Sequence, residues 1–160
     1  NNEFKDVLIS LQVIDYDGRI KTIPSNKINF KYRDTDLPKD IIFLSATFKG
    51  YKNSKSEIQN YMDELKNKKE IAQPTKVKTS GSTFKNPKDQ TDKKVWELIK
   101  ASVSSDISFG DAFISKKHLN FFVNKKNAKY EDMKSLIDYV KNKVKHKTGI
   151  NLDLEIVIVE

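Results

Sequence analysis

A seven-residue run near the middle of the chain, Gly81-Ser82-Thr83-Phe84-Lys85-Asn86-Pro87, places a hydroxyl, an ammonium and an amide on one short segment. The glycine and proline that bracket Ser82 favour a tight, defined backbone path, which would present its hydroxyl to a ligand. The same composition is also typical of a turn whose Ser, Thr and Asn side chains satisfy their own backbone. Taken alone, the run leaves both interpretations open.

A second candidate for chemistry is Glu155, which interrupts an apolar strand pattern over Leu152 to Val159. Alternation along a strand puts its side chain on the face opposite Leu154 and Ile156. Burying an unpaired carboxylate is costly, so Glu155 lies either on a solvated strand face or at the edge of a cleft, where a carboxyl can act on a ligand.

The net charge of +8 raises the possibility of a nucleic-acid or anionic-membrane partner, because clustered cations bind phosphate arrays. Arginine, the better planar reader of phosphates and bases, occurs only at Arg19 and Arg33, and the lysines are scattered among acidic residues. We therefore expect no nucleic acid and no membrane as partners. A basic nucleic-acid binder stays as an alternative, which a steep salt dependence of binding would reveal.

Length and composition limit the class of protein. A chain of 160 residues can form one ordinary domain or two small ones with a hydrophobic core. The sequence has no cysteine, which excludes disulfides and thiolate metal ligands and suits a reducing cytosol. No apolar run of membrane-spanning length and no secretory leader is visible. We expect a cytoplasmic monomer that holds no metal.

The first part of the chain has the pattern of a β-hairpin followed by a strand. Val7 to Tyr16 alternates as a strand does, Asp17-Gly18 predicts a hairpin turn, and Arg19 to Ile23 predicts the partner strand. Ile41 to Phe48 is almost continuously apolar, which predicts a buried strand.

A helix is expected after Ser54, which forms a capping-box pattern with Glu57. Four apolar residues at helical spacing then share one face: Ile58, Tyr61, Met62 and Leu65. The stretch from Lys66 to Ser80 is polar and Lys-rich and contains Pro74, which predicts a linker between two lobes.

The remaining elements mix helices and strands. We expect helices over Val95 to Val103 and Tyr130 to Lys147, short strands over Ala112 to Ser115 and Phe121 to Asn124, and a closing strand over Leu152 to Val159. Gly149 predicts the end of the long helix. The apolar face of that helix predicts core residues, namely Met133, Leu136, Ile137, Val140 and Val144. With hairpins in place of regular βαβ units, the fold class is α+β.

Several short runs also occur in a recognisable order and spacing: Phe30 to Asp34, Ile42 to Phe48, Gly81 to Pro87, Gly110-Asp111-Ala112, Ser115-x-Lys117-His118, Asn124-x-x-Asn127-Ala128 and Leu152 to Glu155. In these runs the chain resembles the UDP-N-acetylenolpyruvoylglucosamine reductases, also called UDP-N-acetylmuramate dehydrogenases or MurB, of the type that lacks an extra substrate-loop insertion. The resemblance covers essentially the whole chain.

That resemblance implies a bacterial cytoplasmic oxidoreductase of peptidoglycan synthesis, and thus of cell-wall biogenesis, cell shape and cell division. In this flavoprotein family, NADPH reduces FAD, and the flavin passes hydride to UDP-N-acetylglucosamine enolpyruvate to give UDP-N-acetylmuramate. FAD is therefore the implied cofactor, NADPH the co-substrate and a UDP-sugar the substrate.

Three positions match the catalytic residues of the family. Ser82 lies where the proton donor lies, Arg33 where an active-site arginine lies, and Glu155 where an acidic catalytic partner lies. The chemistry suits these residue types, because hydride addition to an enol ether conjugated to a carboxylate builds negative charge that Arg33 and a protonated Glu155 can stabilise by hydrogen bonding.

Five further assignments rest on the same resemblance. Lys85, Asn86 and His118 are implied to bind substrate, and Tyr32 together with Arg33 to contact the cofactor. For His118 a purely structural role is the open alternative.

The resemblance also implies a domain division. Residues 1–80 with 152–160 would be the second part of an FAD-binding domain, a hairpin, strand, helix and C-terminal strand, and residues 81–151 a smaller α+β substrate-binding domain. Nothing in Asn1 to Val7 corresponds to the glycine-rich flavin-binding region of the family, so we expect a C-terminal part that lacks the N-terminal FAD-binding half and is incomplete for activity alone.

The chain departs from the family pattern at three positions: Asp111 replaces a glycine, Leu154 a proline and Val157 an arginine. The alternative function is a non-catalytic module that binds a UDP-sugar or a partner protein.

Overall fold

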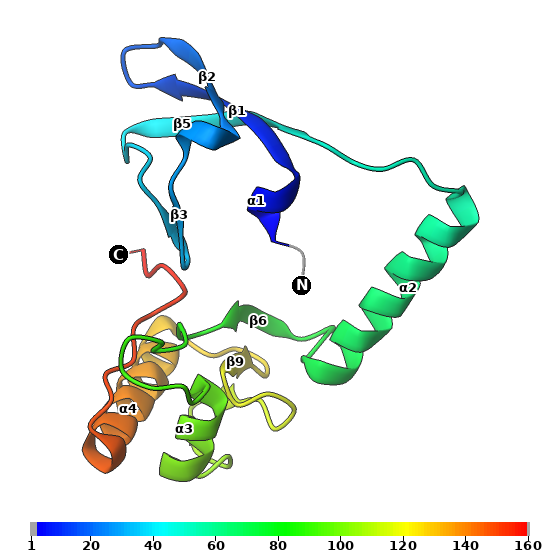
Figure 1. Cartoon of the computed structure of the whole chain (residues 1–160). Coiled ribbons are helices and arrows are strands. Elements are labelled where there is room, and N and C mark those ends of the chain that lie inside the picture. Colours follow the sequence, from blue (N-terminus) through cyan, green and yellow to red (C-terminus); the bar gives the residue numbers. More distant parts are fainter. Residues whose placement is uncertain (1–2, 160) are drawn as a thin grey trace. The chain divides into compact units, whose positions relative to one another are not determined.

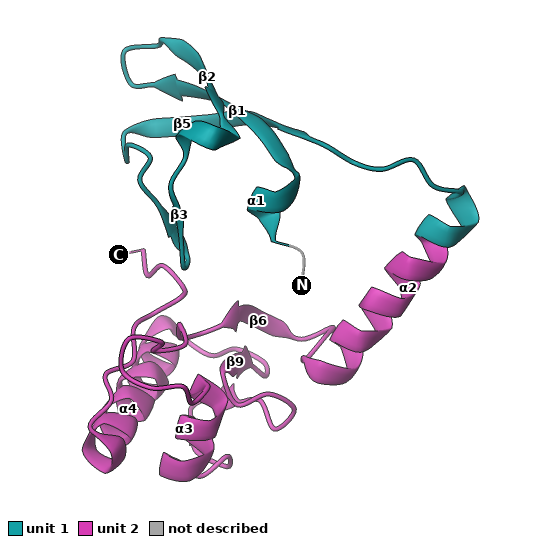
Figure 2. Cartoon of the chain, viewed as in Figure 1, with its two compact units in different colours: residues 1–58 teal, residues 59–160 magenta. Residues whose placement is uncertain are grey.

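A computed structural model describes residues 3–159 and divides the chain into two compact units, Asn1–Ile58 and Gln59–Glu160 (Figure 2). Helices and strands are mixed in it, which confirms the predicted α+β class (Figure 1). The division falls inside helix α2, Lys55–Ala72, so the two units are described separately below.

The first unit is built on a three-stranded antiparallel sheet with the strand order β2-β1-β5. The hairpin predicted at its start is confirmed. The elements of this unit are the short helix α1 (Phe4–Val7), β1 (Leu8–Asp15), β2 (Ile20–Pro24), the 3-10 turn η1 (Ser25–Lys27), β3 (Phe30–Lys31), β4 (Asp34–Thr35) and β5 (Ile41–Phe48).

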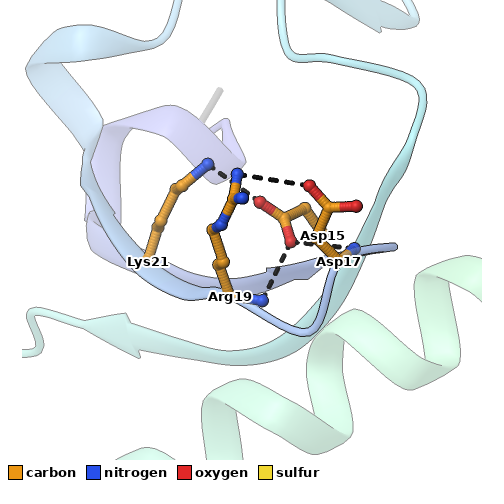
Figure 3. A network of polar contacts seen from close by, with 4 residues as sticks. All are labelled: Asp15, Asp17, Arg19 and Lys21. Atoms are coloured by element: carbon orange, nitrogen blue, oxygen red, sulfur yellow. Dashed lines mark hydrogen bonds and ion pairs between the residues drawn. The ribbon is translucent and has the colours of Figure 1, made fainter.

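A network of polar contacts fixes the turn between β1 and β2 (Figure 3). The carboxylate of Asp15 accepts the backbone N–H groups of Asp17 and Arg19 at 3.2 and 2.9 Å, and it pairs with the ammonium of Lys21 at 3.0 Å. The N–H of Arg19 and the ammonium of Lys21 hold the pKa of Asp15 below its ordinary value. The Arg19 guanidinium lies 3.2 Å from Asp17, so one of the two arginines of the chain is engaged in this turn.

Strand β5 lies where it was predicted, but the expectation that it is buried is wrong. Ile42, Phe43 and Leu44 are 54%, 58% and 46% exposed. An apolar run indicates a preference for burial, but burial also requires a surface that covers the strand. Among residues 3–159, β5 is an edge strand with β1 as its one neighbour in the sheet.

Helix α2 starts as predicted and extends further than predicted. The N–H of Glu57 donates to Ser54 Oγ at 3.2 Å, and the N–H of Ser54 donates to Glu57 Oε2 at 3.4 Å, which confirms the capping box. The helix continues to Ala72, so the predicted linker over Lys66 to Ser80 is wrong for most of its length. Lys, Glu and Ala favour helix, and the helix ends just before Pro74.

The apolar face of α2 carries the residues that the sequence placed there. Ile58, Tyr61, Met62 and Leu65 are between 46% and 57% exposed. None of the described residues of α2 is buried. No helix in residues 3–159, α2 included, has the length and apolar character needed to cross a bilayer.

The second unit packs two helices with a four-stranded antiparallel sheet of order β6-β9-β8-β7. The predicted helices and both predicted short strands are confirmed within one or two residues. The elements are β6 (Lys78–Ser82), α3 (Val95–Ser102), β7 (Ser108–Phe109), β8 (Ala112–Ile114), β9 (Phe121–Asn124) and α4 (Tyr130–Thr148).

Helix α4 supplies much of the core of this unit. Four of the five residues predicted for its apolar face, Leu136, Ile137, Val140 and Val144, are at most 3% exposed, and Met133 is partly buried against them. Other parts of the unit contribute the remaining buried residues of the cluster: Phe84, Val95, Leu98, Ile99, Ala112, Ile114, Phe122 and Leu152. Gly149 ends α4 in the left-handed conformation, as predicted.

The closing strand predicted over Leu152 to Val159 is reduced to a single antiparallel bridge between Leu154 and Phe84. Its partner segment turns away at Asn86 and Pro87, and proline has no N–H to donate to a ladder. The terminal segment thus pairs inside the second unit. The predicted division into residues 1–80 with 152–160 and residues 81–151 concerns functional domains and stays a prediction.

Replacing Gly110 by alanine should destabilise the second unit by about 2–3 kcal/mol. Gly110 turns the β7–β8 hairpin at φ +52°, and a Cβ there would lie 2.5 Å from Oδ2 of Asp132, the atom that accepts the Lys129 N–H at the start of α4. Urea unfolding followed by the fluorescence of Trp96, the single tryptophan, measures the loss.

The matched control is Gly149→Ala, also at positive φ but with no atom within 4 Å of the added Cβ. It should lose only the backbone cost of about 1–2 kcal/mol. Equal losses in the two variants would contradict the argument from Asp132.

Candidate active site

Ser82 ends strand β6 directly after a β-bulge. Pairing between β6 and β9 shifts register between Thr79 and Ser82, and Gly81 within the bulge has φ +89°. Beyond the bulge Ser82 pairs with Phe121. A bulge re-aims the side chain that follows it, so the tight backbone path predicted around Ser82 is confirmed, in the form of a bulge rather than a free turn.

The residues after Ser82 run between two other segments of the chain. On one side the N–H of Thr83 donates to the carbonyl of Asn120 at 2.7 Å. On the other, the N–H of Glu155 donates to the carbonyl of Thr83 at 2.9 Å, and the N–H of Lys85 donates to the carbonyl of Asp153 at 2.9 Å. These bonds place Glu155 beside Thr83, one residue from Ser82.

Glu155 is half-buried, and its Oε2 atom is shielded from solvent. This burial does not fit a fully solvated carboxyl, and the position of Glu155 at the edge of a cleft stays a prediction. The hydroxyl of Thr83 is also buried beside it, in a residue that is 1% exposed. The structure thus brings a partly exposed serine and a largely shielded carboxyl onto adjoining backbone segments.

Lys85 and Asn86 continue the same segment. Lys85 is partly exposed. Asn86 Oδ1 accepts the N–H of Val95, the first residue of α3, at 3.0 Å, and so satisfies one of the free donors at that helix start. Asn86 therefore links the Ser82 segment to α3.

His118 lies in the loop between β8 and β9. Its ring packs edge-on against Phe121, the cross-strand partner of Ser82, with 4.8 Å between ring centroids. The N–H of Asn120 donates to His118 Nδ1 at 3.3 Å, which favours the neutral ring with its proton on Nε2. Burial lowers the pKa of His118 below its ordinary 6.5.

Tyr32 and Arg33 belong to the other unit, where they form the two-residue turn of the β3–β4 hairpin. Arg33 adopts φ +59°, which is uncommon for a residue with a side chain. Its guanidinium lies 5.9 Å from the centre of the Tyr32 ring. Backbone strain of this kind is frequent at ligand-binding positions, so the hairpin tip is a candidate contact.

A pocket of about 500 Å³ lies in the same unit, at the base of this hairpin. Its lining is almost wholly apolar and includes Phe4, Leu11, Phe30, Leu37, Phe43 and Leu44. Its volume is within the range of pockets that bind small molecules.

Asn120 is the residue of this site that the sequence did not reveal. It is 5% exposed, and its side chain bonds to the backbone of Phe84. In the sequence it is one asparagine before an apolar strand, and such a position is usually a solvated strand end.

Comparison with known families shows to which family the chain belongs. Residues 73–159, which contain Ser82, His118 and Glu155, match the family described as UDP-N-acetylenolpyruvoylglucosamine reductase, C-terminal domain. The chain belongs to this family. The resemblance noted in the sequence is thereby confirmed, while the roles of the individual site residues are not tested by the match.

Relatives at the level of whole proteins agree. The UDP-N-acetylenolpyruvoylglucosamine reductase of Pelagibacter ubique is 65% identical over all 160 residues, which cover 53% of that protein, and that of Rickettsia conorii is 39% identical over 97% of the chain and 52% of the relative. The crystal structure of this reductase (MurB) from Thermus caldophilus superposes with a TM-score of 0.75 at 30% identity, covering 94% of the chain and 52% of that structure. The chain spans about half the length of the relatives it matches.

The second unit should lose stability as the pH falls below about 6.5, through His118. Its folded pKa lies below the unfolded value, so the unfolded state binds more protons in that window; the stabilisation is present above pH 6.5 and is lost on acidification. Urea unfolding at about pH 7.5 and about pH 5.5, read by Trp96 fluorescence, measures this loss.

His118→Gln should reduce the difference in unfolding free energy between the two pH values. His146→Gln, which changes the other histidine of the chain, should leave it as in the parent protein. An unaltered difference in His118→Gln would show that other groups cause the pH dependence.

Proposed function

We propose that the protein containing this chain is a UDP-N-acetylenolpyruvoylglucosamine reductase, which uses NADPH and FAD to convert UDP-N-acetylglucosamine enolpyruvate to UDP-N-acetylmuramate in peptidoglycan synthesis. The observation that supports this most strongly is the bond from the Glu155 N–H to the Thr83 carbonyl, which sets the backbone of Glu155 beside the residue that follows Ser82, in a chain of this family. A cytoplasmic, monomeric enzyme is part of the proposal.

The described residues fit FAD in part. The apolar pocket of about 500 Å³ and the Tyr32–Arg33 hairpin tip offer an apolar, aromatic and cationic surface suited to a flavin ring. They offer no glycine-rich run that could cradle a diphosphate: the glycines of the first unit are Gly18, in the β1–β2 turn, and Gly50, which are far apart in the sequence. We propose that Tyr32 and Arg33 contact the ring end of FAD, and that the diphosphate is held by polypeptide outside these 160 residues.

FAD, when bound, supplies the hydride that NADPH provides. The residues of this chain act on the substrate side of the reaction. A hydride added to the β-carbon of the enolpyruvyl group pushes the electron pair of the double bond toward the carboxylate. Glu155, in its protonated form, stabilises that charge by donating a hydrogen bond. Arg33, which belongs to the other unit, is proposed for the same role because it matches the active-site arginine of the family.

Ser82 completes the reduction by giving its proton to the α-carbon. The product then carries one added hydride and one added proton, and the proton returns to Ser82 from solvent. A serine hydroxyl is a weak acid, so a nearby cation would be needed to favour the transient negative charge on Ser82, and we propose Lys85 for this role.

The remaining residues orient the substrate. Lys85 supplies a cation for the negatively charged UDP-sugar, and polar groups come from Asn86 on the Ser82 segment and from His118 in the β8–β9 loop. A neutral His118 both donates through Nε2 and keeps Nδ1 for the N–H of Asn120.

Replacing Ser82 by alanine in the full-length, FAD-loaded protein should leave reduction of the flavin by NADPH intact. Reoxidation of the reduced flavin by the enolpyruvyl UDP-sugar should slow by on the order of 10²- to 10⁴-fold, the usual contribution of a positioned acid. Stopped-flow flavin absorbance separates the two half-reactions.

Ser80→Ala is the matched control, since Ser80 is an exposed serine on the same strand. Its reoxidation rate should equal that of the parent protein. If reoxidation proceeds normally in Ser82→Ala, Ser82 is not the proton donor.

A non-catalytic module that binds the UDP-sugar is the second candidate. This candidate is favoured because the second unit has a hydrophobic core of its own and contains both Ser82 and Glu155, whereas the apolar pocket lies in the first unit. Titration of the 160-residue chain with the UDP-sugar, together with NADPH oxidation by the full-length protein, separates the two. Binding without any turnover by the FAD-loaded full-length protein would favour the module.

A further inference from the structure

Asn120 makes a pair of hydrogen bonds that resembles one rung of a β-ladder. Its side-chain Oδ1 accepts the N–H of Phe84 at 3.0 Å, and its Nδ2 donates to the carbonyl of the same residue at 2.8 Å. Asn120 is 5% exposed and Phe84 is 2% exposed, so both bonds are removed from water. The side-chain amide of Asn120 therefore pairs with the Phe84 N–H and carbonyl as the backbone of a neighbouring strand would.

The backbone of Asn120 adds two further bonds. Its carbonyl accepts the N–H of Thr83 at 2.7 Å, and its N–H donates to Nδ1 of His118 at 3.3 Å. One residue thus fixes the two positions that follow Ser82 and also orients the imidazole of His118.

The same chain of contacts reaches Glu155. Thr83 is bonded to Asn120 through its N–H and to Glu155 through its carbonyl. The bridge between Phe84 and Leu154 runs alongside. Displacing Phe84 and Thr83 would therefore move the backbone that carries Glu155 as well as the backbone that carries Ser82.

We propose that Asn120 is a positioning residue, which holds the Ser82 hydroxyl and the Glu155 carboxyl in reacting geometry without touching the substrate. This inference rests on the proposed reductase function. Displacements of about 1 Å at a reacting group can cost on the order of 100-fold in rate, so a clamp on the adjoining backbone controls the chemical step. Substrate binding through other groups should be much less affected.

The experiment uses the full-length, FAD-loaded protein with Asn120→Ala. Its kcat for reduction of the UDP-sugar should fall by on the order of 10- to 100-fold, while KM for the UDP-sugar changes by less than about threefold and flavin reduction by NADPH keeps its rate. A loss of stability alone would lower the amount of folded enzyme. It would therefore lower kcat and the apparent rate of flavin reduction by NADPH together, whereas a positioning role lowers kcat alone.

Asn124→Ala is a matched control within the same hairpin. The side chain of Asn124 bonds to the backbone of Ala128 in the same manner, accepting its N–H at 2.9 Å and donating to its carbonyl at 3.5 Å. Ala128 does not adjoin any of the proposed site residues. Asn124→Ala should keep kcat within about threefold of the parent value.

Asn120→Asp supports the comparison, because it keeps an acceptor for the Phe84 N–H and removes the donor to the Phe84 carbonyl. Its kcat should lie between those of the parent and Asn120→Ala, and it replaces Asn120→Ala if the latter does not fold. If neither variant folds, Asn120 is required for the fold itself and the positioning role is wrong.

The remaining outcomes separate this inference from the proposed function. If Ser82→Ala stops reoxidation while Asn120→Ala behaves like Asn124→Ala, the positioning role alone is overturned. If Ser82→Ala leaves reoxidation unchanged, the proposed role of Ser82 fails whatever Asn120 does.

Discussion

The need to satisfy buried peptide groups governs the second unit. Its segment Thr83 to Lys85 crosses an apolar core, where an unpaired N–H or carbonyl is expensive. The described structure meets this need from two sides, with Asn120 on one and Asp153 to Glu155 on the other. The segments that contain Ser82 and Glu155 adjoin because these buried backbone groups have to be paired. The arrangement of the candidate site residues therefore follows from hydrogen bonding in the core.

Much of this fold follows from local pattern. The hairpin at Asp17-Gly18, helices α3 and α4, strands β8 and β9 and the capping box of Ser54 were predictable because turn chemistry and periodicity act over a few residues. The burial of β5, the length of α2 and the terminal strand were not, because they depend on partner surfaces and on where Pro74 and Pro87 interrupt the chain. For the site, Ser82 and Glu155 were predicted as candidates, whereas Asn120 depends on a contact between segments distant in sequence.

The two arginines of the chain show how context separates similar residues. Arg19 lies in the β1–β2 turn, where its guanidinium pairs with Asp17 and its backbone N–H donates to the carboxylate of Asp15. Arg33 stands at a hairpin tip in a strained backbone conformation, beside an aromatic ring. Its neighbour Asp34 starts β4. At the open end of the hairpin, the carboxylate of Asp36 accepts the N–H of Asn29 at 2.8 Å. A hydrogen-bonded base thus supports a tip in an unfavourable backbone conformation.

The pairing of Phe84 with Leu154 has a consequence for the order of folding. The two residues are separated in sequence by α3, the β7–β9 strands and α4, so the contact closes a long loop. Closing such a loop costs chain entropy that only the intervening structure can reduce, and contacts of this kind form late. The neighbouring positions of the Ser82 and Glu155 segments therefore depend on a contact between the two ends of the unit, which requires the intervening helices and strands to be in place.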